Sequence, residues 1–401
     1  MADSGRGKFT EGVRSMSHRQ HIAAILLVGL VVYGSFIVAD GLMVRQWLDS
    51  SFGTTPDLAI YQERTSLILH GGLIYRDLDI EAPPLINYFL LPPQIMGGEW
   101  WAYEIYFSLF PILTSICMYL VMRRWDDRRA FLAALLFVIC PFAVQDATWG
   151  IQDEPMVAFF YLLPAILLMG GYARSSAIAA AVGFWTKFLP IVTYPITLLS
   201  LKGTRERLIS IGLVVVISCL VALPFLILAP EEFLRFPSYY LLGRSGQGSA
   251  GMSIINLVGV GGWHLPGEVG ASLTVAALVL SYYLFKKWKL DVWRGAMLTT
   301  VMFISIYPMI RLGYFILPFA FFSVWAVQYK GIALRLIPMY ITLLFGQGFE
   351  RASPGFDQPY SWLLGLILVT AGILIMLDIT RLCLKRPCLL DEVRREGLPS
   401  A

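Results

Sequence analysis

The segment TTPDLAIY occupies residues 54–61, and IEAPPLINY follows it at residues 80–88. In the first segment a proline precedes Asp57, an arrangement typical of the first turn of a helix, where a carboxylate meets the positive end of the helix dipole. Leu58, Tyr61 and the apolar residues 67–69 make an amphipathic segment that can lie along the membrane interface, and two glycines at 71 and 72 end it. The prolines at 83 and 84 then open an apolar stretch at 85–96 that is too short to span a bilayer. The whole connection is therefore predicted to be a structured loop with interfacial helices.

The composition around this loop is that of a membrane protein. Of the 401 residues, 57% are hydrophobic and 14% are charged, whereas soluble domains carry about 25% charged residues. About 20 apolar residues cross a bilayer as a helix. Apolar runs lie at about 22–38, 103–122, 130–146, 155–171, 176–200, 207–229, 269–285, 295–310, 313–328, 332–348 and 361–382. We predict an all-α polytopic membrane protein with about 10–12 transmembrane helices in a single domain, residues 21–385.

Charge is distributed unequally between the connections. With a cytoplasmic N-terminus, the inside connections are rich in Lys and Arg (123–129, 202–207, 286–294, 330–335), while most acidic residues fall in the outer loops at about 40–102, 146–154, 230–267 and 349–360. This asymmetry follows the positive-inside rule. It predicts cytoplasmic tails at 1–20 and 386–401, and a retained anchor at 22–38 rather than a cleaved signal peptide. The compact loops favour a prokaryotic plasma membrane.

The run at 176–200 begins and ends at basic inside connections, so it must either re-enter or break into two helices. Its middle carries Gly183, Lys187, Pro190 and Pro195. Irregular backbone at membrane depth persists only where it faces protein or a polar cavity. We therefore expect a broken or re-entrant helix pair with Lys187 at a polar site.

These two regions resemble the GT-C class of integral-membrane glycosyltransferases, in particular the polyprenyl-phosphate-mannose-dependent mannosyltransferases. The resemblance rests on Asp57 after the first span, on GLIYRD at 72–77 with EAPPLINY at 81–88, and on GFWTKFLP at 183–190. Together these motifs cover less than a quarter of the chain. The resemblance implies transfer of a sugar, expected to be mannose, from a polyprenyl-phosphate carrier to a hydroxyl of a glycolipid or glycan at the extracytoplasmic face.

The resemblance also implies roles for individual residues. Asp57 would be the general base of an inverting displacement, although a helix cap is an alternative role for it. The leaving lipid phosphate requires fixed positive charge. Arg244, in a Gly- and Ser-rich outer loop, Arg311, between two apolar runs, and Lys187 are the expected cations, and His264 is a further phosphate-binding candidate.

The sequence QDEP at 152–155 forms a second acidic motif at the start of a span. By itself the pattern is typical of a helix N-terminus, with Asp153 near the cap and Pro155 in the first turn. The resemblance implies that the acidic pair Asp153 and Glu154 belongs to the active site. The residues expected to bind the sugar or acceptor are Tyr61, Trp149, Gln152, Asp153 and Glu154. Interfacial packing is the alternative role for Trp149. Carriers with a single phosphate need no metal, so no cofactor is expected; a divalent cation held between the carboxylates is the alternative.

Two other classes of function fit part of the pattern. A transporter or a flippase for lipid-linked sugars also has broken helices and intramembrane charge, but no internal repeat is visible here. A structural membrane subunit would leave Asp57 and Lys187 without a role. No nucleotide-binding or zinc-binding motif is present, and no nucleic-acid partner is expected. The expected partners are the polyprenyl-phosphate sugar, its acceptor and membrane lipids.

Overall fold

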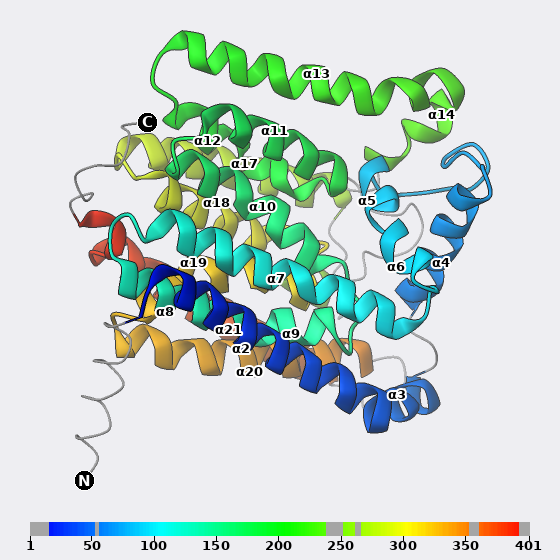
Figure 1. The fold of residues 1–401 in the computed structure, drawn as a ribbon, viewed down its shortest axis with the longest axis horizontal. Coiled ribbons are helices and arrows are strands. Elements are labelled where there is room, and N and C mark those ends of the chain that lie inside the picture. The colour runs from blue at the N-terminus through cyan, green and yellow to red at the C-terminus, as the bar shows by residue number, and fades with distance from the viewer. Residues whose placement is uncertain (1–15, 53–55, 238–251, 261–265, 353–360, 393–401) are drawn as a thin grey trace.

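The computed structural model describes residues 16–52, 56–237, 252–260, 266–352 and 361–392, and within these ranges the regular structure is entirely helical. Among the described residues, six helices are long and apolar enough to cross a membrane, where about 10–12 were predicted for the whole chain. They are α2 His18–Ala39 with its continuation to Trp47, α7 Trp100–Met122, α13 Thr204–Leu228, α17 Gly267–Lys287, α20 Lys330–Ala352 and α21 Ser361–Lys385. They lie roughly side by side (Figure 1). The prediction of an all-α, multi-pass membrane protein is confirmed.

Shorter apolar helices fill the interior of this bundle. They include α10 Glu154–Met169, α18 Val292–Ile306 and α19 Ile316–Ala326. Every residue of α19 is buried by protein, whereas many apolar side chains of α13 are exposed. Because the bilayer is as apolar as the protein core, exposed Leu and Val on outer helices are compatible with contact to lipid. The hydropathy pattern thus predicted both kinds of helix, those enclosed by protein and those with exposed apolar side chains.

One predicted run is bent where the sequence analysis expected a single helix. Residues 130–146 are divided between α8 Asp127–Val138 and α9 Pro141–Ala147, which meet at an angle of 43°. Pro141 occupies the first turn of α9, where its missing N–H leaves no hydrogen bond unmade. The bend directs the end of α9 into the turn at 148–153, which carries three of the candidate residues.

The predicted break in the run at 176–200 is present. Helix α11 Ala173–Thr186 ends before Lys187, whose backbone is extended, and the short helices η2 Leu189–Val192 and α12 Tyr194–Ser200 follow. Gly183 permits this arrangement, because a Cβ there would lie 3.0 Å from the Phe160 carbonyl oxygen and 3.1 Å from Pro190. The lack of a side chain at Gly183 therefore lets Pro190 and the Phe160 backbone pack closely against α11, next to the break at Lys187.

The first connection was expected to begin at about residue 40, but the helix continues past that point. A π-helical turn, η1 Asp40–Val44, leads into α3 Arg45–Phe52. Helices α4 Pro56–Leu69, α5 Pro84–Phe89 and α6 Leu91–Ile95 follow and lie at one end of the bundle with α14 Pro230–Phe233 (Figure 1). We call this the acidic end. The expected short helices of the first connection are confirmed.

The segment between α4 and α5 contains no regular helix, and residues of the GLIYRD motif at 72–77 hold it in place. Tyr75 adopts a positive φ of 72°, donates a 2.6 Å hydrogen bond to the Ala82 carbonyl oxygen and packs edge-on against Phe225 and Phe233. Hydrogen bonds from Arg76 and from the Leu73 N–H lower the pKa of Asp77 to about 2. These contacts hold the connection between α4 and α5 against α13 and α14.

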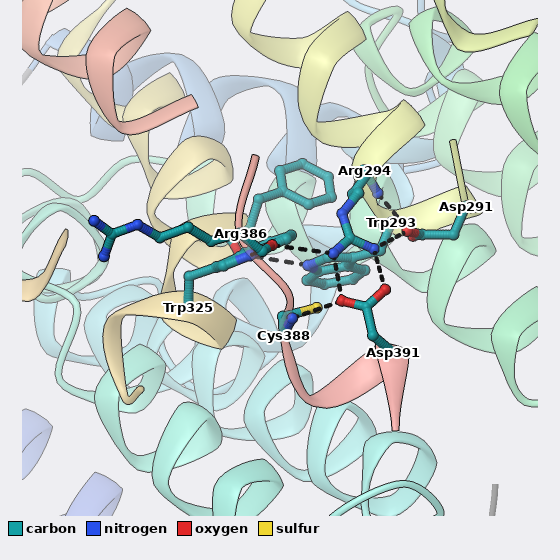
Figure 2. A network of polar contacts seen from close by, with 8 residues as sticks. Asp291, Trp293, Arg294, Trp325, Arg386, Cys388 and Asp391 are labelled. Atoms are coloured by element: carbon teal, nitrogen blue, oxygen red, sulfur yellow. Dashed lines mark hydrogen bonds and ion pairs between the residues drawn. The ribbon is translucent and has the colours of Figure 1, made fainter. Parts of the chain in front are cut away.

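The opposite end of the bundle, which we call the basic end, carries a network around Arg294 (Figure 2). Its guanidinium bonds Asp291 and Asp391, each at 2.6 Å, and lies over the Trp325 ring at 5.3 Å. The Trp325 indole in turn donates to the Arg386 carbonyl oxygen. The network therefore fixes the segment after α21, with η4 Leu389–Asp391, to α18 and α19.

Candidate active site

Asp57 lies in the first turn of α4, as the sequence predicted. Its carboxylate accepts a 2.6 Å hydrogen bond from the Gln152 side-chain amide, and the guanidinium of Arg311 lies 3.8 Å from the same oxygen, Oδ2. Among the described residues no hydrogen bond involves the second oxygen, Oδ1. Asp57 is thus a partly exposed carboxylate that is oriented through Oδ2 alone.

Gln152 reaches Asp57 because the turn at 148–153 has an unusual backbone. Ile151 is fully buried with a φ of +46°, a conformation that a β-branched residue rarely adopts and that costs about 1–3 kcal/mol. Three backbone hydrogen bonds hold the turn: Gly150 to Gln145, Ile151 to Thr148, and Gln152 to Asp146. Strain of this kind persists only where surrounding contacts fix it, and it marks the turn as a candidate functional element.

Lys187 joins the break after α11 to the start of α10. Its ammonium lies 2.8 Å from Asp153 and 3.0 Å from Glu154, and all three side chains are at most 12% exposed. The Tyr314 ring lies beneath the ammonium at 5.4 Å, a favourable cation–π distance. The structure therefore brings together two motifs that the sequence separates by more than thirty positions.

Two carboxylates share this single ammonium, so the group as ionised carries an excess negative charge. Burial raises the pKa of Asp153 to about 6, although Lys187 opposes the shift. Buried ion pairs gain little net stability, but removing one partner leaves an uncompensated buried charge. Lys187 therefore holds the Asp153–Glu154 pair in place and occupies the position between the two carboxylates.

Arg311 is the more exposed of the two cations, at 43% against 12% for Lys187. It precedes η3 Leu312–Phe315, in which Gly313 packs against the site. A Cβ on Gly313 would overlap the Asp146 carboxylate and approach the Glu154 side chain. The absence of a side chain at 313 therefore lets Asp146 and Glu154 lie against the backbone that carries Arg311.

Tyr61 and Trp149 lie beside these residues with buried or half-buried rings. Tyr61 stacks on Tyr103 at 5.9 Å, and burial, followed by the charges of Asp153, Asp57 and Glu154, raises its pKa. The Trp149 ring packs on Phe36 of the first span at 5.1 Å. The structure thus places both residues at the acidic end, Tyr61 within electrostatic reach of the carboxylates and Trp149 against α2.

Six of the predicted site residues form one group: Asp57, Gln152, Asp153, Glu154, Lys187 and Arg311. Arg244 and His264 lie outside the described residues. Sequence reasoning missed Tyr314 and Gly313 and gave Asp146 no role. Gly313 and Tyr314 lie two and three residues after Arg311, but a glycine and a tyrosine inside an apolar run are ordinary residues in a membrane helix, so only the structure shows their place.

No group of three or more His, Cys, Asp and Glu side chains within the described ranges is arranged to hold a metal ion. The Asp153–Glu154 pair is occupied by the Lys187 ammonium instead.

Neither protein-family models nor the sequences of curated proteins match this chain. Among solved structures, the fold is similar to that of ArnT from Cupriavidus metallidurans, determined bound to undecaprenyl phosphate. The two share 14% identity with a TM-score of 0.51, over 91% of this chain and 78% of ArnT. The fold is GT-C-like. At this identity the similarity establishes the architecture, which agrees with the class that the sequence motifs indicated.

Proposed function

We propose that this chain is a membrane glycosyltransferase that moves a sugar from a polyprenyl phosphate to a hydroxyl of a glycolipid or glycan acceptor. The observation that carries the proposal is the Asp57 carboxylate, held by Gln152 and faced by Arg311 in a GT-C-like fold. ArnT, which shares this fold, binds undecaprenyl phosphate. A base next to a cation is the pairing that transfer from a lipid phosphate requires.

In the proposed reaction, the acceptor oxygen forms a bond to the anomeric carbon while the bond from that carbon to the phosphate oxygen breaks. Asp57 accepts the acceptor's proton, with Gln152 orienting its carboxylate. The polyprenyl phosphate leaves with the bonding electron pair. Because attack and departure occur on opposite faces, the anomeric configuration inverts.

Arg311 is the proposed ligand of the leaving phosphate. It is the more exposed cation and lies on the Asp57 side of the group. Lys187 is already bonded to Asp153 and Glu154, so a phosphate on Lys187 has to compete with both. We propose that Lys187 mainly orients this acidic pair toward the sugar hydroxyls and adds positive charge behind Arg311. Arg244 and His264 remain proposed phosphate ligands from the sequence.

Mannose is the proposed sugar because of the motifs at 72–88 and 183–190. No cofactor is proposed, because Lys187 stands where a divalent cation would bridge Asp153 and Glu154. The proposed site faces the extracytoplasmic side, where the acidic connections are expected by the positive-inside rule.

The test uses purified protein in liposomes with radiolabelled polyprenyl-phosphate mannose, a membrane lipid extract as acceptor source, and EDTA throughout. We expect labelled mannose in a new glycolipid. Transfer from a polyprenyl-phosphate pentose but not from the mannose donor would correct the sugar and retain the class of enzyme. No transfer, together with protein-dependent movement of the labelled lipid between leaflets, would replace the proposal with a flippase.

A further inference from the structure

A second buried ionic cluster lies where the first span passes the candidate site. Arg45 bonds Asp40 at 2.7 Å and Glu104 of α7 at 3.1 Å. The side chains of Asp40 and Glu104 are fully buried and that of Arg45 is 10% exposed. Both carboxyl groups belong to helices long and apolar enough to span a membrane. Charged groups at such positions are costly and mark functional elements.

The π-helical turn creates this cluster. Asp40 and Arg45 are five residues apart, a spacing that puts side chains on different faces of an α-helix. In η1 the Arg45 N–H bonds the Asp40 carbonyl oxygen, and this wider turn brings the two side chains to the same face. The Arg45 guanidinium then lies 5.5 Å from the Trp100 ring. Single π turns are frequent at functional sites.

The cluster contains two carboxyl groups for one guanidinium. One oxygen of each, Asp40 Oδ1 and Glu104 Oε2, has no hydrogen-bond partner among the described residues. Both carboxyl groups contact the same nitrogen of Arg45, Nη2, at 2.7 and 3.1 Å, so one proton shared by the pair balances the charge of the group. Such sharing makes the cluster neutral and removes the cost of an uncompensated buried charge.

The same guanidinium reaches the candidate active site. Arg45 Nη2 donates a long hydrogen bond, 3.4 Å, to the carbonyl oxygen of Trp149, while the Trp149 ring packs on Phe36. The turn at 148–153 is thus held to the first span by two parts of Trp149, its carbonyl oxygen and its ring. Three residues later in this turn, Gln152 bonds Asp57.

We propose that Arg45 is a positioning residue: with Asp40 and Glu104 it fixes the strained turn at 148–153, so that Gln152 holds Asp57 in its reactive orientation. The inference rests on the proposed function for its kinetic readout. A displacement of the turn by a fraction of an ångström misorients the base without touching the donor phosphate. Loss of Arg45 therefore lowers kcat and leaves the KM for the donor unchanged.

A triple variant separates positioning from charge balance. In Asp40→Asn/Arg45→Met/Glu104→Gln all three side chains are neutral and of similar size, so the buried region stays uncharged. We expect a melting temperature near that of the wild type, a kcat lower by about tenfold or more, an unchanged donor KM, and faster hydrogen–deuterium exchange at 148–152. A wild-type kcat in this variant would show that the cluster only balances charge and would overturn the proposal.

Two further variants complete the test. Arg45→Lys keeps the charge but has no counterpart of Nε, which bonds Asp40 at 2.8 Å while Nη2 contacts Asp40, Glu104 and the Trp149 carbonyl. It is therefore expected to fold and to share the low kcat and fast exchange, even where the triple variant fails to fold. A wild-type kcat in Arg45→Lys would overturn the proposal. Arg335→Met, which removes an exposed ion pair with Asp378, is the matched control and should change neither readout.

Failure of the proposed function is recognised separately. If the wild type transfers no sugar, the enzyme assignment fails, and exchange at 148–152 still tests Arg45. Unaltered exchange in Arg45→Lys would then overturn the positioning role.

Discussion

At the scale of single residues, Lys187 shows how a buried charge is stabilised by its partners. Its ammonium is the partner of two buried carboxylates, so its removal affects stability before it affects chemistry. The sequence predicted that Lys187 is an intramembrane cation with a functional role, because burying an isolated charge is costly. That its partners would be Asp153 and Glu154 depends on how α10 and α11 pack, which no local pattern contains.

Replacement of Lys187 is expected to destabilise the protein strongly. Lys187→Met leaves two buried carboxylates without their cation and should lower the free energy of unfolding by about 3–5 kcal/mol. Lys187→Arg keeps the charge and should lose less. Thermal unfolding in detergent measures both, with exposed Lys202→Met as the control. Equal stability of Lys187→Met and the wild type would show that the ion pairs do not support this site.

Asp153 provides a pH dependence with a defined sign. Its pKa in the folded protein is about 6, above the ordinary value of about 3.9, so ionisation costs stability in the folded state. The associated stability is present below pH 4 and is lost as the pH rises through 6. Asp153→Asn should therefore raise the free energy of unfolding at pH 8 by about 1 kcal/mol or more relative to the wild type, and by less at pH 5. Thermal unfolding at the two pH values measures this difference. The exposed Asp79→Asn is the matched control, and an equal shift at both pH values for Asp153→Asn would contradict the assignment.

At the scale of elements, the site depends on backbone segments that are not regular α-helix. Asp57 begins a helix, Lys187 lies in a break, Gln152 follows a strained residue and Arg311 precedes a short 3-10 helix. The break at 187 could be predicted because prolines and charge interrupt an apolar run. Pro141 could likewise have indicated the bend between α8 and α9, because a proline cannot continue a helix from the residues before it. The π turn after α2 could not be predicted, because its sequence continues a helical pattern without a distinct signal.

Gly313 tests the packing of one such segment. Gly313→Ala places a methyl group into the Asp146 carboxylate, so η3 or Asp146 must shift and Arg311 moves relative to Asp57. We expect kcat to fall by about tenfold or more, with a protein that remains folded. Gly212→Ala is the matched control, because a Cβ there meets nothing within 4 Å. Full activity in Gly313→Ala would show that the contact is not needed for catalysis.

The Arg294 network tests whether the two ends of the bundle are independent. Arg294→Met removes its ion pairs with Asp291 and Asp391 and should lower the free energy of unfolding by about 1–3 kcal/mol. The network drawn in Figure 2 joins η4 to α18 at the basic end, far along the bundle from Asp57, so kcat should not change. A large fall in kcat with unchanged stability would indicate coupling between the ends that the contacts do not explain.

At the scale of the whole molecule, hydropathy predicted nearly every apolar helix, because burial in lipid and burial in protein demand the same side chains. The class of fold followed from the motifs at 72–88 and 183–190, and the similarity to ArnT agrees with it. What the sequence left open is mutual placement: that Trp149 lies on Phe36, that Glu104 pairs with Arg45, and that Gly313 meets Asp146. Such contacts depend on helix packing, and only the buried charge at 104 gave a signal that could have been recognised in advance.

Sugar transfer by Asp57→Asn in proteoliposomes is the measurement closest to the central claim. With polyprenyl-phosphate mannose as donor, the variant is expected to keep the donor KM of the wild type but to transfer sugar about 10²–10⁴ times more slowly. The exposed Asp79→Asn in the same connection should transfer at the wild-type rate. A wild-type rate in Asp57→Asn would contradict the role of Asp57 as the base.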